Sequence, residues 1–248
     1  MESTNAYALT HLRELSDRDV VEAGIQTAGR GRLNRSWISH VPGNLAISLV
    51  LKPAGPAASL PLANLSQLLA VCLCDQLEGP DVQPTIKWPN DVQVQGRKVA
   101  GLLAQAVTSG EHFLGLVLGL GVNLNLDPAI LAVIDQPATA LNLIRGCPID
   151  RDAFRDDLLD RFFAAYGPFL QQGFPTIRTP FARRCSFLGK RIEIRLPSGS
   201  LQGTAEDIDA GGALILRRPD GGAERVTLGE VFGLPALAVS PEWRLDRA

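Results

Sequence analysis

Long apolar runs are absent from this chain of 248 residues, in which no stretch reaches the roughly 18 apolar residues of a membrane-spanning helix. The first five residues also lack the basic and apolar regions of a secretory signal peptide. Hydrophobic residues still make up 46% of the sequence, which is ordinary for a protein with a packed core. We therefore expect a cytoplasmic protein with no membrane partner.

Metal-binding side chains are scarce. The three histidines are scattered, and the four cysteines form no CxxC pair and have no histidine nearby. We expect reduced, structural cysteines and no dedicated metal site. The residues concerned are His11, His40, His112, Cys72, Cys74, Cys147 and Cys185.

An excess of positive charge is missing as well. The net charge is −2 and the isoelectric point about 5.9, which argues against duplex nucleic acid as a partner. Against this background, residues 29–35 (GRGRLNR) stand out because they hold three arginines and two glycines. Glycine lets the backbone approach a ligand closely, and arginine offers a rigid fork that matches phosphate or carboxylate. The loop therefore predicts a local anion site, with an RNA contact as the alternative.

The common nucleotide-binding and nucleophile motifs are also absent. There is no P-loop, and a GxGxxG reading fails because Asn34 replaces the third glycine and no helical pattern follows. No convincing Ser-His-Asp or Cys-His arrangement is present. The sequence therefore gives no sign of a protein nucleophile.

Hydrophobic periodicity predicts an α+β fold, with a mixed or antiparallel sheet flanked by helices. The long apolar strand near residue 120 should lie at the centre of the sheet. Predicted strands are 45–51, 85–88, 91–95, 98–107 and 113–126, and predicted helices are 59–77, with Ser59 as N-cap, and 152–171.

The character of the sequence changes after about residue 181. Short strands separated by Pro- and Gly-containing turns predict a small β-barrel near the lower size limit for an independent core. We therefore divide the chain into domains at residues 1–183 and 184–248. The predicted strands of the second domain are 190–196, 201–208, 213–217 and 225–228.

Three more motifs accompany the arginine loop. They are KWPND at 87–91, a strand ending in a tight turn, KVAG at 98–101, and GLGVN at 119–123, where glycines interrupt an apolar strand. Glycine inside a strand often marks a close approach of backbone or ligand. Taken singly, each motif also fits a turn, a solvated strand end or a packing contact.

Together and in this order, the motifs resemble the catalytic core of biotin protein ligases. The resemblance begins at Ser3-Thr4-Asn5, similar to that family's opening motif, and extends to Gly229-Glu230-Val231, similar to its closing motif. It implies a class II synthetase-like core with an SH3-like C-terminal barrel. It also implies ATP-dependent formation of biotinyl-5′-AMP and transfer of biotin to a lysine of biotin carboxyl carrier protein.

The resemblance implies a role for each matching residue, with Mg²⁺ carried by ATP. Catalytic residues would be Arg30, Arg32 and Lys98. Biotin-binding residues would be Ser3, Thr4, Asn5, Gln26, Gly29, Arg30, Gly31, Arg32, Lys98 and Gly101. Residues binding ATP or the adenylate would be Arg32, Arg35, Trp37, Lys87, Asn90, Asp91, Asn123 and Thr139.

Departures from the family pattern refine these expectations. No helix-turn-helix domain precedes Ser3, so we expect a monofunctional ligase that does not bind nucleic acid, either a monomer or a homodimer. Asn34 stands where the family commonly has glycine, and residues 232–234 (FGL) replace the usual serine and basic residue. We therefore expect no direct ligand contact from the C-terminal domain. The alternative enzyme is a lipoate or octanoate protein ligase or transferase of the same fold.

Overall fold

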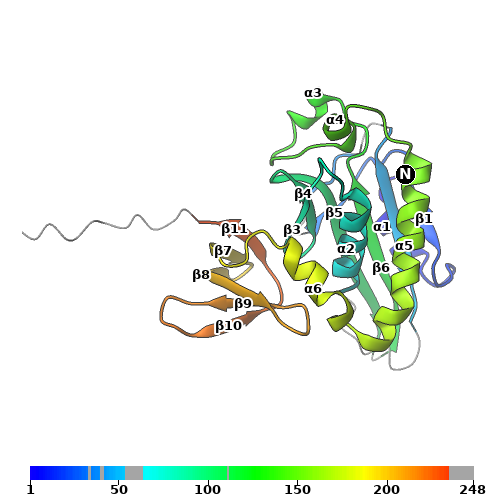
Figure 1. Cartoon of the computed structure of the whole chain (residues 1–248). Helices are drawn as coiled ribbons and strands as arrows, with labels where there is room; N and C mark the ends of the chain where they lie inside the picture. Colours follow the sequence, from blue (N-terminus) through cyan, green and yellow to red (C-terminus); the bar gives the residue numbers. More distant parts are fainter. Residues whose placement is uncertain (33–34, 40–41, 54–63, 111, 235–248) are drawn as a thin grey trace, which may run out of the picture.

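The computed structural model describes residues 1–32, 35–39, 42–53, 64–110 and 112–234. A six-stranded antiparallel sheet, ordered β1-β2-β6-β5-β4-β3, and the helices around it form the larger part of the molecule (Figure 1). The predicted N-cap Ser59 and the loop residue Asn34 lie outside the described residues. The strands are β1 (Val20–Glu22), β2 (Leu45–Leu51), β3 (Pro84–Lys87), β4 (Asp91–Val94), β5 (Arg97–Ser109) and β6 (His112–Val122).

The central strands are buried as the sequence predicts. All seven residues of β2 are buried, and β2 pairs with β6 from Leu45 opposite Val122 to Leu51 opposite Leu116. β6 lies third in the six-strand order, which confirms its predicted central place. β1 was not expected, and it provides a short edge strand beside β2.

Helices cover both faces of this sheet. The alternation of side chains along β2 sends Leu45, Ile47 and Leu49 into the large core beneath three helices, whereas Val50 packs with Ala8 on the opposite face. The three helices are α2 (Leu65–Leu77), α5 (Arg151–Gln172) and α6 (Pro175–Arg184), and the opposite face carries α1 (Thr4–Thr10). Two short helices, α3 (Pro128–Leu131) and α4 (Leu141–Arg145), lie between β6 and α5.

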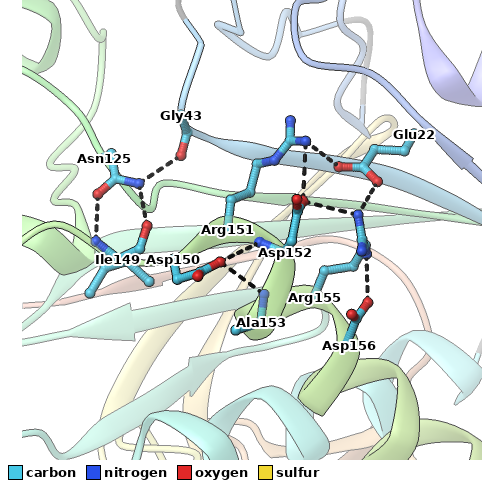
Figure 2. Close-up of polar contacts among 10 residues, drawn as sticks. All are labelled: Glu22, Gly43, Asn125, Ile149, Asp150, Arg151, Asp152, Ala153, Arg155 and Asp156. Atoms are coloured by element: carbon cyan, nitrogen blue, oxygen red, sulfur yellow. Dashed lines mark hydrogen bonds and ion pairs between the residues drawn. The ribbon is translucent and has the colours of Figure 1, made fainter.

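The start of α5 is fixed by polar contacts (Figure 2). Asp150 caps the helix by accepting hydrogen bonds from the backbone N–H groups of Asp152 and Ala153, both at 3.0 Å. The Glu22 carboxylate of β1 accepts a hydrogen bond from Arg155 Nη1 at 2.7 Å and forms an ion pair with Arg151 at 3.2 Å. The edge strand is thus joined to the longest helix.

A second antiparallel sheet follows α6, with the order β10-β9-β8-β7-β11. Within the described residues, β10 and β11 are its two edges, so the sheet is open and not closed into a barrel. Its buried side chains, such as Ile194 and Leu216, join the same core as α2 and α6. The strands are β7 (Arg191–Leu196), β8 (Gly199–Ile208), β9 (Leu214–Arg217), β10 (Ala223–Val226) and β11 (Glu230–Gly233).

The cysteines of the described residues are free; Cys72, Cys74 and Cys185 are buried, as expected for a structural role, whereas Cys147 is exposed. Burial raises the pKa of Cys72 and Cys74 to about 12, so neither thiol ionises readily. No helix in the described part of the chain is long and apolar enough to cross a membrane.

Candidate active site

A cavity lies where α1, the arginine loop and the KWPND turn meet over β5 and β6. Its lining includes five basic side chains and two acidic ones, so its electrostatic field favours anions. The basic residues are Arg30, Arg32, Arg35, Lys87 and Lys98, and the acidic residues are Asp91 and Glu230.

One end of the cavity is a buried network of neutral polar groups. The Gln26 side-chain oxygen accepts from Thr4 N at 2.8 Å and from Thr4 Oγ1 at 3.2 Å. Ser48 Oγ donates to Asn5 Oδ1 at 2.5 Å, and Asn5 Nδ2 donates to Gln105 Oε1 at 2.9 Å. Ser3, the N-cap of α1, accepts from Ala6 N, which fixes the start of the helix that carries Thr4 and Asn5.

The glycines of β6 make room for two of these side chains. A Cβ atom at Gly119 would overlap the amide of Asn5, and one at Gly121 would overlap the indole of Trp37. The interruption of an apolar strand by glycine thus marks a close approach, as the sequence predicted. Asn5 and Trp37 therefore lie directly against the strand floor.

Lys98 is held on two sides. Its Nζ lies 2.9 Å from Asp91 Oδ1 and 5.6 Å from the centroid of the Trp37 ring, and its side chain is 15% exposed. The β4–β5 pairing places Asp91 opposite Gly101, three residues after Lys98. The KWPND and KVAG motifs thus meet at one ion pair.

Arg32 reaches the same turn from the arginine loop. Its Nη1 donates to Asn90 Oδ1 at 2.9 Å and to the carbonyl of Gly229 at 3.4 Å. Burial lowers the pKa of Arg32, while the carboxylates of Asp91 and Glu230 act in the opposite direction. The guanidinium remains charged at neutral pH because its ordinary pKa lies far above 7.

Glu230 enters the cavity from β11. Its carboxylate accepts hydrogen bonds from both Nη atoms of Arg35, at 3.0 and 2.7 Å, and from Lys87 Nζ at 2.9 Å. Burial alone would raise the pKa of Glu230, but the hydrogen bonds from Arg35 and Lys87 prevail and lower it. We expected no ligand contact from the C-terminal domain, yet this domain supplies part of the cavity wall.

Most of the predicted site residues line this cavity. Gly29, Asn123 and Thr139 do not. The Asn123 side chain donates to the Thr139 carbonyl at 3.0 Å, and Thr139 N donates to the Lys98 carbonyl at 2.9 Å, so this pair braces the backbone of Lys98. Those that do line it are Ser3, Thr4, Asn5, Gln26, Arg30, Gly31, Arg32, Arg35, Trp37, Lys87, Asn90, Asp91, Lys98 and Gly101.

Three polar residues were missed by sequence reasoning: Ser48, Gln105 and Glu230. Ser48 is the single polar residue of an otherwise apolar strand, which is a usable signal for a buried functional hydroxyl. Gln105 lies in β5 with Lys98, two residues along the same face from Leu103. Glu230 was noted only as part of the closing motif, and its placement depends on how the two sheets pack.

The carboxylates of the cavity are already engaged. Asp91 holds Lys98, and Glu230 holds Arg35 and Lys87. Among the described residues, no group of histidine, cysteine and acidic side chains gathers in a way that could hold a metal ion.

Comparison with known proteins assigns both parts of the chain. Residues 1–123 match the model of the biotin/lipoate A/B protein ligase family, and residues 187–233 match the biotin protein ligase C-terminal domain. The chain is 39% identical to a biotin–[acetyl-CoA-carboxylase] ligase of Paracoccus denitrificans, over 93% of this chain and 97% of that protein. It is 31% identical to the bifunctional ligase/repressor of Bacillus subtilis, over 82% of this chain and 62% of that protein.

Solved structures share the fold. A biotin protein ligase from Aquifex aeolicus in complex with biotin and ATP superimposes with a TM-score of 0.77 at 26% identity, covering 93% of this chain and 94% of that one. A biotin acetyl coenzyme A carboxylase synthetase from Helicobacter pylori has the same fold at a TM-score of 0.62.

Proposed function

Because this chain belongs to the biotin protein ligase family, we propose that it uses ATP to activate biotin as biotinyl-5′-AMP and transfers the biotinyl group to a lysine of biotin carboxyl carrier protein. One observation carries the proposal. A buried set of neutral donors and acceptors around Thr4, Asn5 and Gln26 lies in the same cavity as a cluster of five cations. Such a site suits a ligand with a neutral polar head and a reacting carboxylate.

The neutral end of the cavity would take the biotin head. Its hydroxyls and amides, on Ser3, Thr4, Asn5 and Gln26, offer both donors and acceptors and carry no formal charge. Because these groups are already held in a network, few rotamers have to be ordered when biotin binds. Gly31 and Gly101, which lack side chains, would let the backbone approach the chain of biotin.

In the first step, the biotin carboxylate attacks the α-phosphorus of ATP and pyrophosphate leaves. Two anions have to meet, and negative charge spreads over the phosphate oxygens, so positioned cations are the main requirement. Arg32 and Lys98 are oriented for this by Asn90 and Asp91, respectively. Arg30 lines the same cavity from an exposed position and would join them once ligand is present.

The remaining cavity residues would hold the nucleotide. Arg35 and Lys87 would contact phosphate oxygens, and Trp37 and Asn90 the adenylate. Mg²⁺ would come with the triphosphate, because both carboxylates of the cavity are bound to cations and Mg²⁺ retains much of its water shell in such sites. Bound there, it would neutralise phosphate charge.

In the second step, the amine of the carrier lysine attacks the acyl carbon of the adenylate and AMP leaves. Lys98 and Arg32 would stabilise the AMP phosphate as the leaving group. No protein nucleophile is needed for either step. Because this second step needs an acceptor lysine, the partner we propose is biotin carboxyl carrier protein. We place the reaction in the cytoplasm, and neither step requires nucleic acid or a membrane.

The test is ATP–pyrophosphate exchange measured side by side with biotin and with lipoate. We expect exchange that depends on biotin and none with lipoate. Exchange with lipoate alone would instead assign the chain to the lipoate branch of the family, which its N-terminal family model also includes.

A further inference from the structure

The turn between β8 and β9 enters the catalytic part of the molecule beneath the KWPND turn. The Gly212 carbonyl accepts from Gln67 Nε2 at 3.0 Å and from Trp88 Nε1 at 3.3 Å. The neighbouring Gly211 carbonyl accepts from Asn64 Nδ2 at 2.7 Å. Trp88 is only 1% exposed and both bonds to the Gly212 carbonyl are buried, whereas the bond to Gly211 is partly buried.

The shape of this turn leaves no space for another residue at its tip. Gly212 has φ of +79°, and a Cβ atom there would lie 2.6 Å from Gln67 Oε1 and 3.0 Å from Phe174 Cε2. Asp209 preforms the turn by accepting from Gly211 N at 2.8 Å and Ala213 N at 2.9 Å. The turn itself therefore holds the Gly212 carbonyl in position, independently of its hydrogen bond to Trp88.

The indole N–H of Trp88 is the polar group of the KWPND motif that donates to this turn, although the Trp88 side chain also forms part of the cavity wall. Its neighbours face the cavity: Lys87 binds Glu230, Asn90 binds Arg32, and Asp91 binds Lys98. The C-terminal domain thus contacts two consecutive residues of the motif, Trp88 through β8–β9 and Lys87 through β11.

We propose that Trp88 is a positioning residue, which links the C-terminal domain to the adenylation chemistry through its Nε1–H bond to Gly212. This inference rests on the function proposed above. When the indole is fixed, the turn that follows it presents Asn90 to Arg32 and Asp91 to Lys98. Side chains that perform chemistry need such a supporting layer of hydrogen bonds to keep their geometry.

The proposal predicts different effects on the binding of the two substrates, ATP and biotin. The groups that would hold the biotin head lie on α1 and β2 and in the segment before the arginine loop, and none of them contacts Trp88 or Gly212 in the hydrogen bonds described. The cations that would act on ATP depend on Asn90 and Asp91. Loosening Trp88 should therefore raise KM for ATP and lower kcat while KM for biotin stays the same.

The first test uses Trp88→Phe and Gly212→Ala in biotin-dependent pyrophosphate exchange. Loss of one buried hydrogen bond predicts a fall of about fivefold in kcat/KM for ATP with Trp88→Phe. Gly212→Ala should fall further because the new methyl group pushes the turn off Gln67. The matched control is Gly221→Ala, since Gly221 also has positive φ, +86°, but has no atom within 4 Å of its Cβ position. It carries the same backbone strain and should keep wild-type constants.

The second test does not depend on activity. Hydrogen exchange followed by mass spectrometry should show faster exchange at residues 87–91 in Trp88→Phe and Gly212→Ala, and wild-type exchange there in Gly221→Ala. The proposal is overturned if KM for biotin rises together with KM for ATP in the two variants, or if the hydrogens of residues 87–91 exchange at the wild-type rate in both. If the wild type shows no biotin-dependent exchange of pyrophosphate, the proposed function fails, and hydrogen exchange still decides whether Trp88 holds the turn.

Discussion

At the scale of single residues, Lys98 is a cation that the cavity holds through both its side chain and its backbone. Asp91 and the Trp37 ring hold its ammonium group, and its backbone is braced by residues 137–139. Lys98→Ala should reduce pyrophosphate exchange by about 10²–10³-fold, the usual cost of removing one preorganised group that stabilises transition-state charge. Exchange is measured with saturating biotin and ATP, and circular dichroism checks the fold.

The control for this prediction is Lys190→Ala, since Lys190 is exposed and lies outside the cavity lining. It should exchange at the wild-type rate. If Lys98→Ala exchanges pyrophosphate as fast as the wild type, Lys98 takes no part in the adenylation step.

Gly119 sets the position of Asn5. In Gly119→Ala the new methyl group would occupy the place of the Asn5 amide, which would have to leave its partners Ser48 and Gln105. We expect KM for biotin to rise at least about tenfold, since a buried polar network would be broken. KM for ATP should change little.

Gly79→Ala is the matched control, because a Cβ atom at Gly79 would have no neighbour within 4 Å. The double variant Gly119→Ala/Asn5→Ala tests the cause, since it removes the group that the methyl meets. Its melting temperature should be higher than that of Gly119→Ala alone. A lower one would show that the clash is not with Asn5.

The sequence predicted which residues lie together best where unusual residues occur in short motifs. Arginines beside glycines and glycines inside an apolar strand each fit a bland explanation singly, but together they pointed to one place, and the structure gathers Arg32, Lys98 and Asn5 around one cavity. Asn123 lies outside the cavity lining and donates to a backbone carbonyl, which the sequence cannot show because a polar residue at a strand end looks the same whether it binds a ligand or a backbone carbonyl. The contacts of Glu230 with the cavity could not be predicted, since its partners Lys87 and Arg35 are 143 and 195 residues away in the chain.

At the scale of elements, the ion pairs between β1 and α5 offer a test of stability without catalysis (Figure 2). Glu22 is 23% exposed and serves both Arg151 and Arg155. Glu22→Gln should lower the free energy of unfolding by about 1 kcal/mol, since two cations lose their shared charged partner in partly desolvated surroundings. Denaturant unfolding measures the change.

Asp156→Asn provides the comparison, because Asp156 also binds Arg155 but is 64% exposed. It should change stability by less than about 0.5 kcal/mol. Neither residue lines the cavity, so both variants should retain pyrophosphate exchange. Equal losses of stability would mean that the burial of Glu22 adds nothing.

Elements were predicted well where periodicity extended over enough residues. β2 has the predicted bounds, and α5 and β6 differ from prediction by a few residues. α1 was missed because its seven residues are too few for a helical stripe and are held by tertiary contacts of Thr4, Asn5 and Ala8. α6 was missed because it contains two prolines, one of them inside the helix, which read as a loop.

At the scale of the whole molecule, Glu230 makes the contact between its two parts dependent on pH. Its carboxylate accepts from Arg35 and Lys87 of the catalytic part, and these bonds outweigh burial and lower its pKa. A group whose pKa falls on folding binds fewer protons in the native state, so it adds stability above its unfolded pKa. That contribution disappears as the pH falls through the lowered folded pKa.

Glu230→Gln should therefore melt at a lower temperature than the wild type near pH 7, and the difference should shrink below about pH 4, where the unfolded carboxyl begins to gain protons. Thermal unfolding over a pH series measures it. Glu206→Gln is the comparison within the C-terminal domain, because the Glu206–Arg217 pair is nearly half exposed on both sides. It should change little at any pH. A difference for Glu230→Gln that persists unchanged into acid would mean that packing, and not charge, joins Glu230 to the catalytic part.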